Sequence, residues 1–206
     1  MPDKGVYFLI VEGFADWEAA HALAELRRHG GYRVEAVGLS RDPVVSMGGL
    51  AVVPSQTLAD IDPMDVAAFV IPGGDRWETG PVEPELESTL KRLDELQVPI
   101  AAICGATVAI CRIGLLRGRR HTSNGLKYLQ SQVPGYAEEQ QYVDAPAVRD
   151  RGLITASGLA NVEFARELFE QLGVLSPADR ALWVDMFRHA RLPDEAPGVI
   201  SGASTA

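Results

Sequence analysis

Cysteine is scarce in this sequence, with only two in 206 residues. Cys104 and Cys111 lie seven positions apart, so they cannot form the disulfide framework of a small secreted domain. A chain of this length buries roughly 70% of its unfolded surface and needs no such cross-links. Free thiols are typical of a reducing compartment, and we therefore expect a cytoplasmic protein.

Positive charge and long apolar runs are also scarce. The 19 lysines and arginines are outnumbered by 28 acidic residues, which gives a net charge of −9. Such an acidic chain is a poor partner for polyanions, so we expect no nucleic acid and no membrane as partners. No apolar stretch is long enough to span a bilayer, and we expect no signal peptide.

Histidine is rare as well, and its four positions form no cluster. No cysteine and histidine spacing matches a zinc site, so the sequence predicts no metal. Each histidine is most simply interpreted as a surface or structural residue. His121 is the best candidate of the four to reach a pocket, because it lies at the end of a predicted short strand. The other three are His21, His29 and His189.

Apolar runs alternate with helical patterns along the chain. This alternation predicts an α/β fold, a mostly parallel sheet covered by helices on both faces. We expect a single domain over residues 1–192 and a flexible tail over 193–206, which is rich in Pro, Gly, Ser and Ala. The predicted strands are 6–11, 34–39, 66–71, 98–103 and 153–156. The predicted helices are 16–29, 84–96, 105–116, 162–172 and 177–188. Shorter pieces are an extended pair around a turn at 46–50, strands at 120–122, 141–143 and 147–149, and a helix at 126–129.

The segment 98–107 has the pattern of a nucleophile elbow, in which a strand turns sharply into a helix at the reactive residue. Small residues flank Cys104 two positions away, at Ala102 and Ala106, and Gly105 follows it directly. Helix N-terminal amides aimed at the sulfur favour a thiolate. The alternative is that Cys104 is a buried apolar residue, as the pattern around Cys111 suggests for that cysteine.

Two further loops are expected beside Cys104, because ligands in such sheets bind beyond the carboxyl ends of the strands. One is the turn at residues 72–75, where the backbone amides of Gly74 or Asp75, together with that of Gly105, can hold an oxyanion. The other contains Asp16 and Glu18 at the predicted start of a helix. Acidic residues there commonly favour the helix dipole. Alternatively, Glu18 turns inward, hydrogen-bonds the sulfur and exchanges a proton with it.

Four motifs together resemble the ThiJ/PfpI superfamily of class I glutamine amidotransferase-like proteins. They are Gly13-Phe14-Ala15-Asp16-Trp17-Glu18, Ile71-Pro72-Gly73-Gly74, residues 101–107 and residues 152–158. The resemblance implies a flavodoxin-like three-layer sandwich that acts on a small molecule, forms a homodimer and uses no organic cofactor. It implies that Cys104 is the nucleophile and Glu18 the acid in contact with it. It also implies that the backbone amides of Gly74 and Gly105 form the oxyanion site.

The sequence departs from the family at the histidines. The protease branch has a histidine directly after the cysteine, where this chain has Gly105. The branch that includes the parkinsonism-associated protein has one about twenty residues later, where this chain has Asn124. Glutaminases carry a late histidine and glutamate pair, and residues 159–163 lack the histidine. A cysteine, histidine and acid triad is therefore not visible, and protease or glutaminase activity is the less favoured alternative.

Two hypotheses of different kinds remain. In the first, the Cys104 thiolate attacks a small electrophilic carbonyl, amide or nitrile-like carbon, and Glu18 moves the proton. In the second, the protein is a non-catalytic redox sensor of a stress response that is oxidised at Cys104. Residues 76–77 and 122–128 are candidates for the outer wall of the pocket, with Asp16, Asp75, His121 and Asn124 as possible pocket residues.

Overall fold

The computed structural model describes residues 3–192, and the tail predicted over 193–206 lies outside the described residues. Seven strands form one sheet in the order β5-β2-β1-β6-β7-β9-β8. Neighbouring strands run parallel except for the pair β8 and β9 at one edge, which is antiparallel. The predicted α/β fold with a mostly parallel sheet is confirmed.

The strands of the sheet are β1 (Gly5–Leu9), β2 (Arg33–Gly38), β5 (Gln56–Thr57), β6 (Val66–Ile71), β7 (Ile100–Ile103), β8 (Ala147–Asp150) and β9 (Leu153–Ala156). A separate hairpin consists of β3 (Val44–Val45) and β4 (Ala51–Val52). The α-helices are α1 (Ala20–Arg28), α2 (Arg76–Thr79), α3 (Pro84–Glu95), α4 (Ala106–Arg112), α5 (Leu126–Gln132), α6 (Asn161–Gln171) and α7 (Pro177–His189). Short 3-10 turns occupy Leu58–Asp60, Pro63–Asp65 and Glu139–Gln141.

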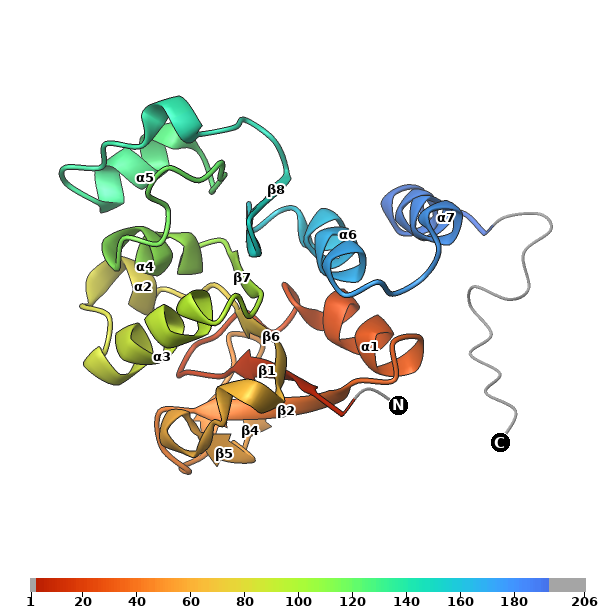
Figure 1. Ribbon diagram of the computed structural model, residues 1–206, viewed down its shortest axis with the longest axis horizontal. Coiled ribbons are helices and arrows are strands. Elements are labelled where there is room, and N and C mark those ends of the chain that lie inside the picture. The colour runs from red at the N-terminus through yellow and green to blue at the C-terminus, as the bar shows by residue number, and fades with distance from the viewer. Residues whose placement is uncertain (1–2, 193–206) are drawn as a thin grey trace.

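The helices cover the sheet in two layers. Helices α1, α6 and α7 lie on one side of the strands and α2, α3 and α4 on the other, with α5 beyond α4 (Figure 1). The central strands β1, β6 and β7 are buried along their whole length. Continuous apolar runs such as Val66–Ile71 are what a parallel strand covered on both faces requires. The sandwich implied by the resemblance is therefore present.

Several boundaries differ from the sequence prediction. The first helix begins at Ala20 rather than at residue 16, because residues 16–19 form turns. Helix α4 ends at Arg112 instead of continuing to 116, and Gly114 follows it with a φ of 85° that a right-handed helix cannot accommodate. The strand expected at 120–122 is only an isolated bridge between His121 and Tyr142. The two helix errors fall at the ends of elements, where local pattern carries the least information.

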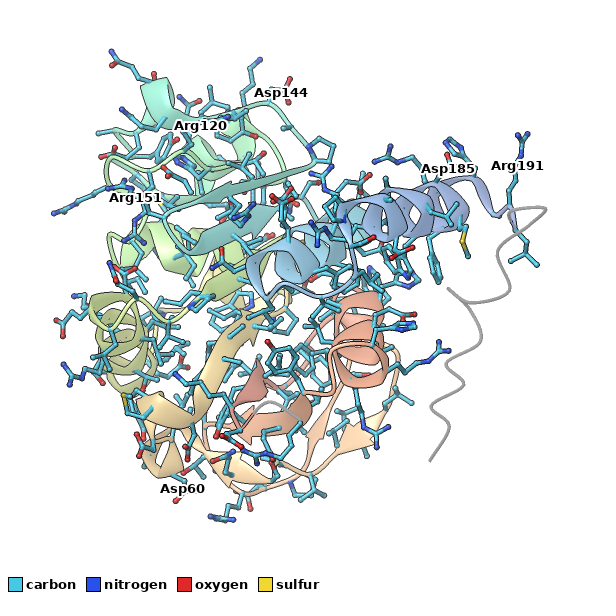
Figure 2. All side chains as sticks on the ribbon, turned by 45° about the vertical axis from the view of Figure 1, so that its right-hand side comes forward. Asp60, Arg120, Asp144, Arg151, Asp185 and Arg191 are labelled. Carbon is cyan, nitrogen blue, oxygen red and sulfur yellow. The ribbon has the colours of Figure 1, made fainter. Side chains whose placement is uncertain are left out.

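Charged side chains occupy the periphery of the molecule. Asp60, Asp185 and Arg191 project outward from the layers (Figure 2). Within residues 3–192, no helix is long and apolar enough to cross a membrane. A few polar side chains are nevertheless buried, and Glu18 is among them at 1% exposed.

Candidate active site

Cys104 stands at a sharp turn between β7 and α4. Its φ of 58° is a left-handed conformation that a cysteine rarely adopts. Its amide donates to the carbonyl oxygen of Ala156 over 2.9 Å, and its carbonyl accepts from the hydroxyl of Thr107 over 2.6 Å. A strained backbone of this kind costs about 1–3 kcal/mol and persists only where its surroundings hold it. The predicted elbow geometry is present.

Two glycines press against the cysteine from neighbouring loops. A Cβ added at Gly73, after β6, would lie 2.7 Å from the Cβ of Cys104. A Cβ added at Gly158, after β9, would lie 2.7 Å from Sγ. Real Cβ atoms do not approach so closely, so the thiol is enclosed on these two sides by backbone that only glycine can supply.

Glu18 reaches the same point from the turns that precede α1. Its carboxylate accepts a hydrogen bond of 2.6 Å from the amide of Gly73 and another from the thiol of Cys104. The side chain is buried, and this burial raises its pKa from 4.5 to about 7 against the lowering effect of both hydrogen bonds. A carboxyl that titrates near neutral pH can accept a proton and return it.

The thiol of Cys104 does not ionise easily at rest, which corrects the expectation of a favoured thiolate. Burial raises its pKa to about 11, and the negative charge of Glu18 adds to the rise. Hydrogen bonds from Asn124 and from the amide of Gly105 oppose the shift without reversing it. Since the thiol and the carboxyl are in contact, they titrate as a pair that holds one negative charge between its two ionisation steps.

The two amides predicted for the oxyanion site lie in adjacent loops. A Cβ added at Gly105 would lie 3.1 Å from the carbonyl oxygen of Gly74, so the turn after β6 touches the elbow. The amide of Gly105 donates to Sγ. Among the described residues, the amide of Gly74 donates to no acceptor. Gly74 has a φ of 155°, and a Cβ there would lie 2.9 Å from the carbonyl oxygen of Gly13.

Asn124 contacts the sulfur from the position where one branch of the family has a histidine. Its Nδ2 donates to Sγ of Cys104 over 3.3 Å, and its Oδ1 accepts from the amide of Gly158 over 2.9 Å. Because Oδ1 is the only acceptor on an asparagine side chain, the bond from the Gly158 amide fixes which end of Asn124 faces the thiol. Asn124 can therefore donate to sulfur, but it cannot take the thiol proton.

Three other predicted pocket residues have their partners elsewhere. The carboxylate of Asp16 accepts a 2.6 Å bond from the hydroxyl of Ser46 in the β3–β4 hairpin. Asp75 is exposed ahead of α2, with no hydrogen bond to the thiol or to Glu18. His121 is fully buried, and its ring nitrogens contact the carbonyl of Arg119 at 2.7 Å and the hydroxyl of Tyr136 at 2.6 Å. The expectation that His121 reaches the pocket is wrong.

Cys111 and His21 lie in packed surroundings away from the thiol of Cys104. Cys111 is half-buried on α4, where burial raises its pKa to about 11. His21 packs edge-to-face against Trp183 and Phe187 of α7, and burial lowers its pKa. Within the range 3–192, no group of three or more His, Cys, Asp or Glu side chains is placed to hold a metal ion.

Comparison with known proteins places this chain in a family. The model of the DJ-1/PfpI family matches residues 4–171. The chain belongs to the DJ-1/PfpI family. A Bacillus subtilis protein named as an uncharacterized protease, YoaZ, is 34% identical over 190 residues, which cover 89% of this chain and 90% of the relative. A protein of Thermococcus kodakarensis named as a deglycase is 27% identical over 151 residues, covering 73% and 88%.

Solved structures of the DJ-1/PfpI family show the same architecture. The DJ-1 superfamily protein Atu0886 from Agrobacterium tumefaciens has a TM-score of 0.83 and 35% identity, with 91% of this chain and 100% of that one covered. A ThiJ/PfpI family protein from Bacillus anthracis has a TM-score of 0.83 and 29% identity, with 93% of each chain covered. The resemblance inferred from the motifs is confirmed.

Sequence reasoning missed two features of this DJ-1/PfpI site. Gly158 closes one side of the thiol, although the pattern showed only a turn after a strand. Its position beyond β9, on the same sheet edge as Cys104, is the signal that could have found it. Glu78 accepts a hydrogen bond from Tyr128 beside Asn124, and no sequence signal pointed to it because it lies on a short exposed helix.

Proposed function

We propose that this protein is a cysteine-dependent enzyme of the hydrolase or lyase type that acts on a small electrophilic carbonyl, amide or nitrile-like substrate. The observation that carries the proposal is the contact between the strained Cys104 and the buried Glu18, whose pKa is raised to about 7. The amide of Gly105 donates to the sulfur and Gly74 lies in the adjoining loop, which supports these two amides as the oxyanion donors. Nucleophile, proton carrier and oxyanion donors are the three parts that acyl-transfer chemistry needs.

The chemistry begins with transfer of the thiol proton to the Glu18 carboxylate. The resulting thiolate, which accepts hydrogen bonds from Asn124 and the Gly105 amide, attacks the substrate carbon and forms a carbon–sulfur bond. The electron pair of the carbonyl moves to oxygen, where the amides of Gly74 and Gly105 stabilise the negative charge. Protonated Glu18 then returns its proton to the leaving group or to the oxygen. For an amide, water subsequently hydrolyses the thioester and frees Cys104.

This assignment does not use a histidine. The position directly after the cysteine is Gly105, and the one twenty residues later is Asn124, which bonds the sulfur as a donor. Glu18 is the titratable group in contact with the thiol, so it must supply both the base and the acid. Relatives named as deglycases and as an uncharacterized protease support a hydrolytic reaction for this protein. Peptidase or glutaminase activity stays the second alternative.

A substrate screen with three variants tests the proposal. Purified protein is assayed against methylglyoxal, a 4-nitroanilide amide and an aromatic nitrile, and any turnover is followed in Cys104→Ser, Cys111→Ser and Glu18→Gln. Turnover is expected to disappear in Cys104→Ser and to persist in Cys111→Ser, while circular dichroism shows that each fold is intact. Glu18→Gln is expected to lower kcat about 100-fold or more, the range of general acid–base catalysis. Full activity in Cys104→Ser would contradict the proposal.

The expected homodimer also remains a proposal. Exposed apolar side chains on and beside the β3–β4 hairpin support it, since burying them against a second copy would remove them from water. They are Trp17, Val45, Met47, Leu50 and Val53. Sedimentation velocity of the protein and of Leu50→Glu measures the oligomeric state, and a monomer at all concentrations would contradict the proposal. The reducing cytoplasm is proposed on the same footing, from two cysteines that are both free.

A further inference from the structure

A chain of three polar side chains lies on the exposed side of the thiol. Asn124 is exposed and bonds Sγ through Nδ2. Tyr128, one turn further on in α5, accepts a hydrogen bond from the Asn124 side chain. The Tyr128 hydroxyl donates in turn to Oε1 of Glu78 on α2 over 2.7 Å. The chain therefore runs from the sulfur to a surface carboxylate, with the phenol oxygen between them.

The hydrogen-bonding roles along this chain follow from the number of protons. A phenol has one proton, and Tyr128 gives it to the carboxylate of Glu78. Burial and the neighbouring carboxylate raise the pKa of Tyr128, so the group stays a neutral phenol. Its oxygen has no further proton to donate, so beyond the hydrogen bond from Asn124 it can only accept, and Glu78 is itself an acceptor. Tyr128 and Glu78 thus form a wall beside the thiol that offers acceptors and a negative charge to an incoming molecule.

The wall is fixed to the elbow helix by Arg112. This residue of α4 donates 2.8 Å hydrogen bonds to the carbonyl oxygens of Trp77 and Gly80, around α2. It also donates over 3.1 Å to the carbonyl of Gln132 at the end of α5. The two short helices that hold Glu78 and Tyr128 are thus tied to the helix that follows Cys104. A wall held in this way can select by geometry, because its side chains need no ordering when a ligand binds.

We propose that Tyr128, held by Glu78, is a specificity-determining residue that favours uncharged or cationic substrates with an N–H or O–H donor near the reacting carbon and disfavours carboxylates. This inference rests on the proposed function, since it assumes that Cys104 reacts with substrate. Two cations lie beside Glu78: Arg76 of α2 is ion-paired with Glu83, and the Arg112 guanidinium donates to backbone carbonyls around α2, including that of Glu78. A carboxylate substrate therefore meets Glu78 without a free countercharge on that helix.

Two alkylating probes of similar size separate these substrate classes. Iodoacetamide is neutral and carries N–H donors, whereas iodoacetate is an anion that only accepts. Their second-order rates at Cys104 are measured by mass spectrometry in Cys111→Ser protein and divided by their rates with glutathione, which removes intrinsic reactivity. We expect the normalised ratio to favour iodoacetamide by about 10-fold. The ratio cancels any change in thiol ionisation, because the same thiolate attacks both probes.

Tyr128→Phe is expected to slow iodoacetamide about 2- to 10-fold, the range for one lost hydrogen bond, and to leave iodoacetate unchanged. Glu78→Gln, on an exposed side chain, is expected to speed iodoacetate relative to iodoacetamide. Tyr32→Phe is the matched control, because that hydroxyl bonds the carbonyl of Leu172, away from this wall. Circular dichroism checks each fold.

The outcomes separate the two proposals. A ratio equal to that of glutathione, or an equal fall for both probes in Tyr128→Phe, would overturn the specificity assignment while leaving Cys104 reactive. In that case Tyr128 would merely position Asn124. If neither probe labels Cys104 in the folded protein, the proposed function is overturned, and the specificity assignment with it.

Discussion

The buried carboxyl of Glu18 makes the stability of this protein depend on pH in a predictable direction. Its folded pKa is about 7, above the ordinary value of 4.5. The folded state therefore binds the proton more tightly, and this contribution to stability is complete below pH 4.5. This contribution is lost as the pH rises through 7. Glu18 is already ionised in the unfolded chain at these pH values, so folding must take up a proton that becomes scarcer as the pH rises. At about 1.4 kcal/mol per pKa unit, the loss amounts to about 3 kcal/mol.

Glu18→Gln removes this ionisation and keeps the shape of the side chain. Its amide oxygen can still accept the hydrogen bond that Gly73 donates. We expect the free energy of unfolding of Glu18→Gln, relative to wild type, to increase by about 3 kcal/mol between pH 4.5 and pH 8. Urea unfolding at several pH values measures this difference. The rise in the Cys104 pKa to about 11 lies above this window and does not contribute.

Glu85→Gln is the matched control, since Glu85 is an exposed glutamate in the first turn of α3. Its stability relative to wild type is expected to change little over the same range, because an exposed carboxylate keeps its hydration in both states. A difference between Glu18→Gln and wild type that stays constant from pH 4.5 to pH 8 would refute the claim that Glu18 titrates as a buried group.

Three further predictions concern the thiol. Gly158→Ala should slow alkylation of Cys104 at least 10-fold, because the new Cβ would lie 2.7 Å from Sγ, a conflict of the size that costs about 1–3 kcal/mol. Gly80→Ala is the control, because the atom nearest to its new Cβ would lie 3.6 Å away, and Cys104 in this variant should be alkylated at the wild-type rate. Equal alkylation rates in Gly158→Ala and Gly80→Ala would count against the packing of Gly158 on the thiol. Asn124→Ala should raise the thiol pKa further, since it removes a donor to sulfur, and an unchanged pH titration of alkylation would exclude that role. When the protein is treated with mild peroxide, oxidation of Cys104 should proceed no faster than the loss of enzymatic turnover. Stable oxidation of Cys104 in a protein that turns over none of the substrates would favour the redox sensor instead.

The sequence predicted the central sheet and the three loops of the site because both follow from local pattern. Strand Val66–Ile71 is a continuous apolar run, and the small residues around Cys104 allow the tight turn that a nucleophile elbow needs. A parallel sheet brings the ends of such strands together whatever lies between them. The contact between Glu18 and Cys104 could therefore be anticipated, even though the helix boundary beside Glu18 was misplaced by four residues.

Ionisation and distant partners could not be predicted in the same way. The favourable helix N-terminus near Cys104 is visible in the sequence, whereas the burial that raises the thiol pKa depends on Gly73 and Gly158 from other strands. His121 looked free at a strand end, yet Tyr136, fifteen residues later, occupies its ring nitrogen. Both results depend on which segments fold onto one another, and local residue patterns do not contain that information.

The most direct test of the central claim is the pH profile of Cys104 alkylation by iodoacetamide in Cys111→Ser protein. If Glu18 and Cys104 titrate as a pair, the rate rises through pH about 7, levels off while the pair shares one proton, and rises again toward pH about 11. Glu18→Gln should show a single rise without the step near pH 7. The same profile in both proteins, or one step near the ordinary thiol value of 9.0, would contradict the coupling on which the proposed chemistry depends.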